Sequence, residues 1–242
     1  MAIVDKVRAH WPIDEDNDSI GEDIHSTWDL TDRNTLTSDT GKIGKCGNFI
    51  AYSQENIYAG SDDDFYDLQD GFGFSVWFKT ESTFDSNARR VLTKRNQYEI
   101  WRTSGTYGSS DLKIKVNKAS GNVTETLISG LGTNDWYFLY WGCDGSNLKY
   151  SVNGATLTTG GAISDYNTTS YKFEIGNWSG TGLTGRFWNS FIDEVTYWGS
   201  MLTQDEINSI YNSGSGLAYP FSGGDDSATM TQEYYRRLLG GQ

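Results

Sequence analysis

The stretch that decides the fold is "WYFLYWGCDGSNLKYSVNG", Trp136–Gly154. Its first six residues are all apolar, which is typical of a strand that is buried on both faces. The run "NLKYSV" then alternates apolar and polar residues with the period of two that a half-buried strand has. Asp144-Gly145 and Asn153-Gly154 close the two runs, and both dipeptides accept the positive φ angles of tight hairpin turns. The stretch therefore predicts consecutive antiparallel strands.

The same alternation recurs on both sides of this stretch. It is found in "FSVWFK" (74–79), "LKIKV" (112–116) and "YKFEI" (171–175). In the first of these, Trp77 stands on the face opposite the apolar one, so we expect both faces of that strand to be covered. With 28 Gly, 2 Pro and 14% aromatic residues, and with no alternation of strands and helices, the chain is predicted to be all-β. We expect an antiparallel two-sheet sandwich.

One short helix is predicted near the C-terminal end, in "LTQDEINSIYNSG", 202–214. Thr203 and Glu206 have the spacing of a capping box, in which each side chain binds a free backbone N–H group at the helix start. Ile207, Ile210 and Tyr211 then fall on one face. Gly214 is the expected stop.

Charge narrows the range of partners. The formal net charge is −13 and the sequence pI is about 4.5, so the surface should repel nucleic acid and anionic lipid. The first fifteen residues hold no apolar segment of the kind that a signal peptide has, so we expect synthesis in the cytoplasm. Cys46 and Cys143 are then expected to be reduced, buried apolar residues.

The composition changes after Phe221. "SGGDDSATMTQEYYRRLLGGQ" begins as a flexible linker and continues as a short amphipathic helix. Met230, Tyr234 and Leu238 are spaced by four and form its apolar stripe. We predict a sandwich over residues 1–221 and an assembly tail over 222–242.

Several further segments occur in a familiar order: "AHWPIDE", "GKIGKCGNF", "FGFSVWFK", "FEIGN" and "FIDEVTYWGSMLTQDEINSIYNSG". From about His10 to Phe221 the chain resembles the laminin-G-like, pentraxin-like branch of the concanavalin A-like lectin/glucanase superfamily. The resemblance implies a jelly-roll sandwich of two antiparallel sheets with the helix packed outside. The ending "YNSGSGLAYPF" is similar to versions found in bacteriophage structural proteins and bacterial surface proteins.

The resemblance also implies one structural calcium. In related glucanase sandwiches an Asp on the final strand joins an N-terminal acidic residue and backbone carbonyls around the ion. Asp193 in "FIDEVTYWG" matches the strand residue, and Asp14 and Glu15 match the N-terminal partner. The alternative is that Asp193 accepts hydrogen bonds from neighbouring backbone N–H groups without a metal.

Catalysis is not expected. A retaining glucanase on this fold needs two carboxylates close together on one face of a strand, as in the pattern Glu-x-Asp-x-x-Glu. No glutamate of this chain is followed by Asp two residues later. Asp193 and Glu194 are adjacent and should point to opposite faces of a regular strand. The 2 His offer no convincing triad with a nucleophile.

Sugar binding needs aromatic surface and a few polar groups. Trp178, Tyr107 and Tyr166 lie in predicted loops and are the carbohydrate-binding candidates; the alternative is that they pack over the sandwich end. We expect a non-catalytic virion or surface structural or adhesion module that could bind carbohydrate, such as a decoration or fibre-associated protein. Its expected partners are other virion or surface proteins, host-surface glycans and further copies of itself. The alternatives are a free lectin, a location on the bacterial cell surface and, less favoured, a glycoside hydrolase.

Overall fold

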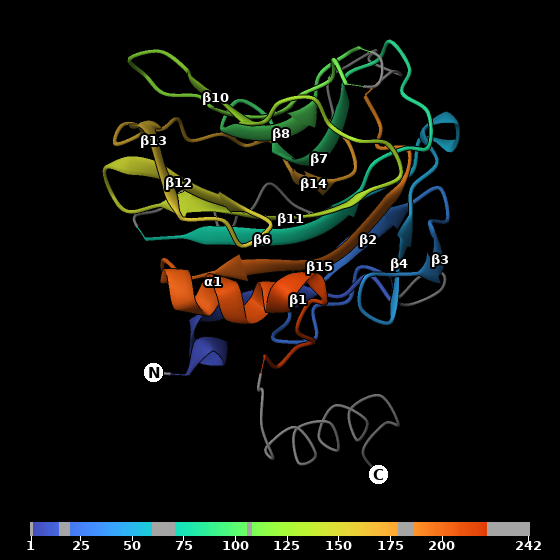
Figure 1. Ribbon diagram of the computed structural model, residues 1–242, viewed down its shortest axis with the longest axis horizontal. Helices are drawn as coiled ribbons and strands as arrows, with labels where there is room; N and C mark the ends of the chain where they lie inside the picture. The colour runs from blue at the N-terminus through green and yellow to red at the C-terminus, as the bar shows by residue number, and fades with distance from the viewer. Residues whose placement is uncertain (1, 15–19, 60–70, 106–107, 179–185, 222–242) are drawn as a thin grey trace.

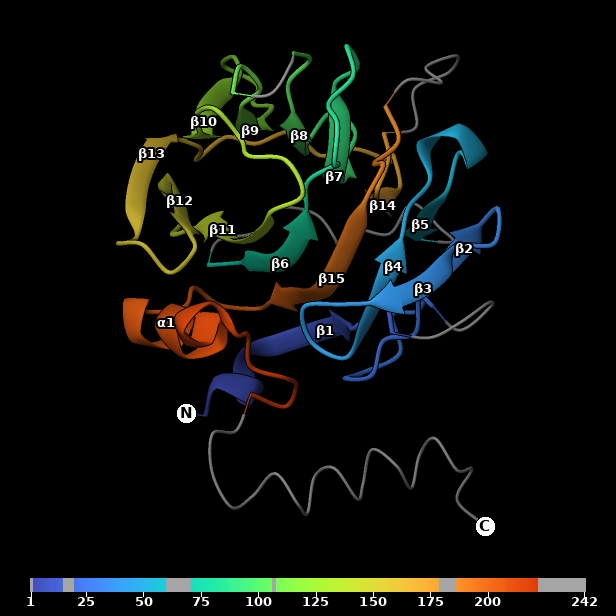
Figure 2. The ribbon, with the colours of Figure 1, turned by 45° about the vertical axis from the view of Figure 1, so that its right-hand side comes forward.

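Two antiparallel β-sheets pack face to face in the computed structural model (Figures 1 and 2). It describes residues 2–14, 20–59, 71–105, 108–178 and 186–221. Within this part of the chain one sheet has eight strands and the other has seven, and all pairings are antiparallel. The predicted all-β jelly-roll sandwich is confirmed.

The strands of the eight-stranded sheet are, in spatial order, β13 (Thr158–Ala162), β12 (Asn147–Val152), β11 (Trp136–Cys143), β6 (Gly73–Lys79), β15 (Phe191–Trp198), β4 (Lys45–Asn48) and β3 (Thr37–Thr40), with β1 (Val7–Trp11) paired to β15. Those of the seven-stranded sheet are β10 (Val123–Ile128), β9 (Leu112–Val116), β8 (Tyr98–Arg102), β7 (Arg89–Lys94), β14 (Phe173–Ile175), β5 (Asn56–Ala59) and β2 (Leu30–Arg33). The short helices of the described ranges are α1 (Gln204–Tyr211) and the 3₁₀ turns η1 (Ile3–Lys6), η3 (Ala51–Ser53) and η5 (Asn212–Gly214).

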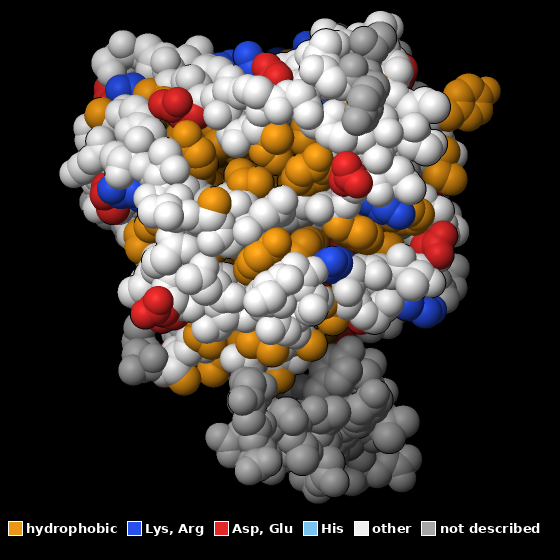
Figure 3. Space-filling view, in the orientation of Figure 1, with side chains coloured by type: hydrophobic (Ala, Val, Ile, Leu, Met, Phe, Trp, Pro, Cys, Tyr) orange, Lys and Arg blue, Asp and Glu red, His pale blue; other side chains and the backbone are white. Residues whose placement is uncertain are grey.

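Aromatic rings join the two sheets through the core. Phe74 of β6 is fully buried and stacks on Tyr197 of β15, with ring centroids 4.6 Å apart. It also stacks on Phe173 of β14 in the opposite sheet, at 5.6 Å. Hydrophobic side chains are visible between the two layers in Figure 3. The alternation in the sequence therefore identified the residues that face the core.

A second apolar layer covers the outer face of the eight-stranded sheet, where α1 lies (Figure 1). Ile207 and Ile210 pack there with Trp77, so the expectation that both faces of β6 are covered is confirmed. The capping box of Thr203 and Glu206 is present. The expected stop at Gly214 is wrong: α1 ends at Tyr211, because Asn212 takes the left-handed conformation with φ of 47°. Asparagine tolerates this region better than most residues do.

The described chain ends in this apolar layer. Phe221 is buried and its ring lies 5.3 Å from that of Trp198. The predicted tail residues Met230, Tyr234 and Leu238 lie outside the described residues, and the division at 221 stays a prediction. Both cysteines are buried and neither forms a disulfide, as expected. No helix in the described ranges is long and apolar enough to cross a bilayer.

Candidate functional site

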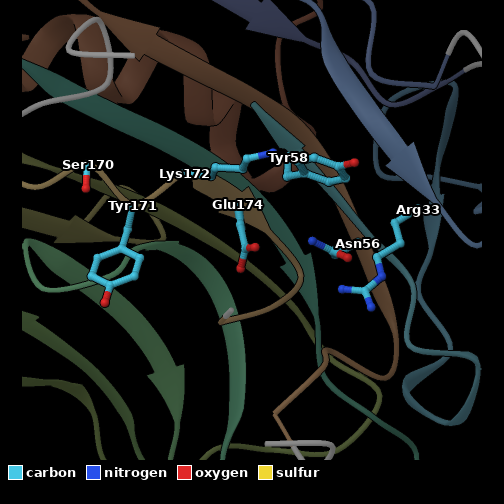
Figure 4. Close-up of a pocket in the computed structure, with 7 residues that line it drawn as sticks. All are labelled: Arg33, Asn56, Tyr58, Ser170, Tyr171, Lys172 and Glu174. Carbon is cyan, nitrogen blue, oxygen red and sulfur yellow. The ribbon is translucent and has the colours of Figure 1, made fainter. Parts of the chain in front are cut away.

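A cavity of about 480 Å³ opens on the outer face of the seven-stranded sheet (Figure 4). It lies over β2, β5 and β14, on the side of the sandwich away from α1. Its lining combines charged, amide, hydroxyl and aromatic groups, namely Arg33, Asn56, Tyr58, Ser170, Tyr171, Lys172 and Glu174.

Strand alternation places these side chains on the outer face. Phe173 and Ile175 of β14 point into the core, so Glu174 between them points outward. Ile57 of β5 is likewise a core residue, which turns Asn56 and Tyr58 outward. The pairings Glu174 with Tyr58, and Asn56 with Arg33, then bring residues from three strands together.

Asn56 is the unusual member of the lining. Its side chain has no solvent exposure, and neither its Oδ1 nor its Nδ2 atom has a hydrogen-bond partner among the residues that the structure describes. A buried polar group without a partner costs about 1–3 kcal/mol. Figure 4 shows its amide between Glu174 and the guanidinium of Arg33. The amide therefore offers one acceptor and two donors to a molecule in the cavity.

Cations lie over the aromatic rings of the cavity. Lys172 Nζ is 4.6 Å from the centroid of the Tyr58 ring, and the guanidinium carbon of Arg95 is 4.4 Å from that of Tyr171. Arg95 is also 5.0 Å from the ring of Trp178, whose other cationic neighbour is Arg186 at 4.4 Å. These contacts make Trp178 a neighbour of the cavity.

The three predicted sugar-binding aromatics thus have different outcomes. Trp178 is half-buried beside the cavity through the Arg95 it shares with Tyr171. Tyr166 forms an isolated β-bridge with Lys118 and packs against the core, and it does not line the cavity. Tyr107 lies outside the described residues. The sequence reasoning missed Asn56, although the alternation in "NIYA" gave the direction of its side chain.

A second cluster lies on the other sheet, around the two adjacent acidic residues of β15. One carboxylate oxygen from each of Asp14, Asp193 and Glu194 lies within 4.8 Å of the others. The expectation that Asp193 and Glu194 point to opposite faces is therefore wrong. Between Asp193 and Thr196 the register with β6 shifts by one residue, which is a β-bulge, and Glu194 has φ of 51°. The extra residue places two consecutive side chains on one face.

The bulge lies where β15 changes partner along one edge. Phe191 and Ile192 pair with β4, whereas the residues from Val195 to Trp198 pair with β1. Asp14 follows β1 closely, and the turn 41–44 leads into β4. The two carboxylates of β15 thus point to the junction between these segments, where Asp14 and the turn meet them.

Burial dominates the electrostatics of this carboxylate cluster. Asp193 is fully buried, and its Oδ2 accepts hydrogen bonds from the backbone N–H groups of Lys42 at 2.7 Å and Ile43 at 3.0 Å. Its Oδ1 has no hydrogen-bond partner in the described part of the chain. Burial, followed by the charge of Glu194, raises the pKa of Asp193 well above its usual value. Burial also raises the pKa of Glu194 to about 8.

Calcium is bound in proteins by carboxylate and carbonyl oxygens. The three carboxylates fit such an ion, since Asp193 Oδ1 and Glu194 Oε2 are buried oxygens without hydrogen-bond partners. Glu15, the third ligand predicted from the sequence, lies outside the described residues. The third carboxylate of the cluster in the structure is that of Glu194. The alternative without a metal required hydrogen bonds from backbone N–H groups to Asp193. These are also present, from Lys42 and Ile43. The calcium stays a prediction.

Comparison with known proteins shows the family. Residues 53–208, more than half of the chain, match the family model described as the concanavalin A-like lectin/glucanases superfamily. The chain belongs to this superfamily, and the resemblance read from the sequence is confirmed. A search of curated protein sequences finds no match.

Solved structures share the fold at low identity. Domain 4 of AbnA, a GH43 extracellular arabinanase from Geobacillus stearothermophilus solved with arabinotriose, matches with a TM-score of 0.61 and 19% identity over 88% of this chain and 98% of that domain. The binding domain of Paraclostridial Mosquitocidal Protein 1 matches with a TM-score of 0.63 and 12% identity over 88% of this chain and 53% of that one. The binding domain of botulinum neurotoxin DC, solved with SialylT, matches with a TM-score of 0.60 and 12% identity, over 87% and 52%. This chain therefore spans about half of each toxin binding domain, and these matches establish the fold alone.

Proposed function

We propose that the protein is a non-catalytic glycan-binding module, displayed on a virion or on a cell surface. The observation that carries the proposal is the buried, unpartnered amide of Asn56 in the cavity of the seven-stranded sheet. A sugar presents hydroxyl groups that both donate and accept, so it would satisfy both atoms of this amide. Glycan-bound structures of the same fold, with arabinotriose or SialylT, add support.

The lining suits a sugar in other respects. Glu174 lines the cavity, and its carboxylate can accept hydrogen bonds from sugar hydroxyls. Tyr58 and Tyr171 add ring surface against which the apolar face of a sugar can pack. A few fixed polar groups around aromatic surface are what a small-ligand site of this kind requires.

The absence of catalysis is part of the proposal. Glycoside hydrolysis needs a pair of available carboxylates. Glu99, which faces outward across β7 from Glu174, is paired with Arg90 at 3.0 Å and Lys115 at 3.2 Å. Asp193 and Glu194 do share a face, but they are buried in the eight-stranded sheet and do not line the cavity.

The placement on a virion is supported by the similarity of "YNSGSGLAYPF" to endings of bacteriophage structural proteins and by the predicted assembly tail. A free lectin and a bacterial cell-surface protein are the alternatives. Mass spectrometry of purified particles tests the placement: the chain should be found at a fixed copy number per particle. Its presence only in the soluble fraction would favour a free lectin.

We also propose one structural calcium held by Asp14, Asp193 and Glu194. It would neutralise buried carboxylate charge and would add stability by binding the folded state alone. The cluster lies on the eight-stranded sheet, whereas the cavity lies on the seven-stranded one. The ion would therefore support the frame, and the glycan would bind elsewhere.

A glycan array probed with the purified protein tests the binding function. Asn56→Ala and Tyr171→Ala should each weaken binding to the glycans found, by about tenfold. Tyr52→Ala is the matched control, because Tyr52 is 97% exposed and does not line the cavity. Circular dichroism and melting should show all three variants to be folded. Binding that persists in both cavity variants would place the site elsewhere.

A further inference from the structure

We infer that the glycan taken by this cavity is acidic, with carboxylate or sulfate groups on its sugars. The inference rests on the proposed glycan-binding function and names its ligand class. The formal net charge of the chain is −13, yet cations lie in and around the cavity. Two cations and one carboxylate, Arg33 and Lys172 against Glu174, stand in the lining itself.

Three cations in or beside the cavity have no acidic partner among the described residues. Ion pairs elsewhere in the chain are close, as for Lys6 with Glu206 at 2.6 Å and Lys149 with Asp144 at 3.1 Å. Arg33, Lys172 and Arg186, by contrast, have no carboxylate within 4.0 Å in the described ranges. In a chain with an excess of acidic residues, unpaired cations around one cavity indicate a site for an anionic ligand.

Two positively charged residues, Arg90 and Arg186, are also neighbours beside the cavity. The backbone N–H of Arg90 donates to the carbonyl oxygen of Arg186, which places the two arginines side by side. The pKa of Arg90 is lowered by burial and further by the charge of Arg186, while Glu99 acts in the opposite direction. Glu99 already binds Arg90 and Lys115, so the charge of Arg186 is left without compensation. An anion near Arg186 would relieve this repulsion.

The cations are arranged as a strip. Lys172 lies over Tyr58 inside the cavity, Arg95 links Tyr171 to Trp178, and Arg186 lies on Trp178. The strip thus continues from the cavity past its edge, and its rings alternate with cations. This pattern fits an oligosaccharide that carries several negative groups better than one that carries a single terminal acid.

Glu174 helps to place the charged groups of the ligand. Figure 4 shows its carboxylate near the middle of the cavity, with Tyr171 on one side, Arg33 on the other, and Lys172 reaching toward Tyr58. An anionic group would be repelled from Glu174 and attracted to Arg33 and Lys172. Hydroxyl groups of the sugar would then meet Glu174 and Asn56, and the acidic groups would meet Arg33, Lys172 and Arg186.

Pairs of polymers that differ only in charge test the inference. Polygalacturonate is compared with its methyl ester, and dextran sulfate with dextran, by affinity electrophoresis and calorimetry. At least one charged polymer should bind at least about tenfold more tightly than its neutral match, because charge-assisted hydrogen bonds are about twice as strong as neutral ones. The preference for the charged polymer should shrink as salt rises. A preference within the polygalacturonate pair would indicate recognition of carboxylate groups, and a preference within the dextran pair would indicate recognition of sulfate groups.

Charge-removing variants locate the contact. Arg33→Gln, Lys172→Gln and Arg186→Gln should each weaken binding of the charged polymer by about tenfold, a larger loss than any that they cause in binding of a neutral polymer. Lys149→Gln, on β12 of the other sheet, is the matched control and should have no effect.

The outcomes separate this inference from the proposed function. Equal binding of charged and neutral polymers, lowered by Asn56→Ala but not by the three charge variants, would overturn the acidic ligand and leave glycan binding standing. If no glycan binds, whether on the array or in this panel, the proposed function is wrong as well.

Discussion

The Nε2 atom of His10 lies 3.2 Å from a carboxylate oxygen of Glu194, with both side chains buried in the sandwich. The two atoms are close, but their geometry is not that of a hydrogen bond. The Nδ1 atom of His10 lies 2.8 Å from the hydroxyl of Thr196. Burial lowers the pKa of His10 to about 3, against the opposing charges of Asp23 and Asp14. Both partners of the contact are therefore uncharged near neutral pH when no metal is bound.

This contact predicts how stability depends on pH when chelator is present. Burial lowers the pKa of His10 from 6.5 to about 3, so its contribution to the stability of the fold rises between pH 3 and 6.5 and changes little above that. Burial raises the pKa of Glu194 from 4.5 to about 8, so its contribution to stability falls as pH rises from 4.5 to 8. Between pH 6.5 and 8 the loss from Glu194 dominates, and the free energy of unfolding should fall by about 1–2 kcal/mol. Urea unfolding at the two pH values measures it.

Glu194→Gln is the control for the pH prediction. The amide has the shape of the neutral acid and does not ionise, so most of the fall between pH 6.5 and 8 should vanish. What remains would belong to Asp193, whose pKa is also raised. A wild-type protein whose stability stays level or rises over this interval would show that Glu194 is already ionised there.

Calcium should raise the melting temperature, and chelator should lower it. An ion that binds only the folded state at 100 times its Kd adds about 2.7 kcal/mol. Asp193→Asn should abolish the response, because it removes a carboxylate charge from a fully buried member of the cluster. Differential scanning calorimetry at matched ionic strength makes the measurement, with magnesium as a control. No shift with calcium in the wild type would leave Asp193 bound only by the N–H groups of Lys42 and Ile43.

Phe74→Ala should destabilise the sandwich by about 3–5 kcal/mol. Phe74 has no solvent exposure and contacts rings from both sheets, including Tyr197 and Phe173. Tyr52→Ala, at a side chain that is 97% exposed, should change stability by less than about 0.5 kcal/mol. Denaturant unfolding compares the two variants, and similar midpoints would contradict the central role of the Phe74 stack.

The protein should release no reducing ends from laminarin, related glucans or any glycan that it binds. Glu99 is held by two cations and Glu194 lies on the other sheet, so neither can pair with Glu174 in hydrolysis. A reducing-sugar assay over several days makes the check. Release of sugar that Glu174→Gln abolishes would establish a hydrolase.

A chain that ends at Phe221 should keep the fold and melt within a few degrees of the full chain. Phe221 completes the apolar layer with Trp198, and the residues after it have the composition of a linker. Such a truncation should lose assembly or incorporation into particles, because the stripe of Met230, Tyr234 and Leu238 needs an apolar partner. Unfolding of the truncated protein would make the tail part of the core. Unchanged assembly would leave the tail without the proposed role.

The sequence by itself determined the local features of this protein. The Asn153-Gly154 turn has the φ angles that the dipeptide predicted, 49° and 69°, and the capping box at Thr203 begins α1 where expected. Alternation predicted the buried face of "LKIKV", where Leu112, Ile114 and Val116 are fully buried. These features depend on residues a few positions apart, whose backbone angles and side-chain directions are set by local chemistry.

Only the tertiary structure decided the sites. The bulge that puts Asp193 and Glu194 on one face lies where β15 leaves β4 for β1 along one edge, a change of partner that no local pattern encodes. The cavity needs Arg33, Asn56 and Lys172 to meet, and they do so because β5 lies between β2 and β14 in the sheet. Strand order depends on how distant segments share the core, so the direction of each side chain could be predicted but not the neighbours it would meet.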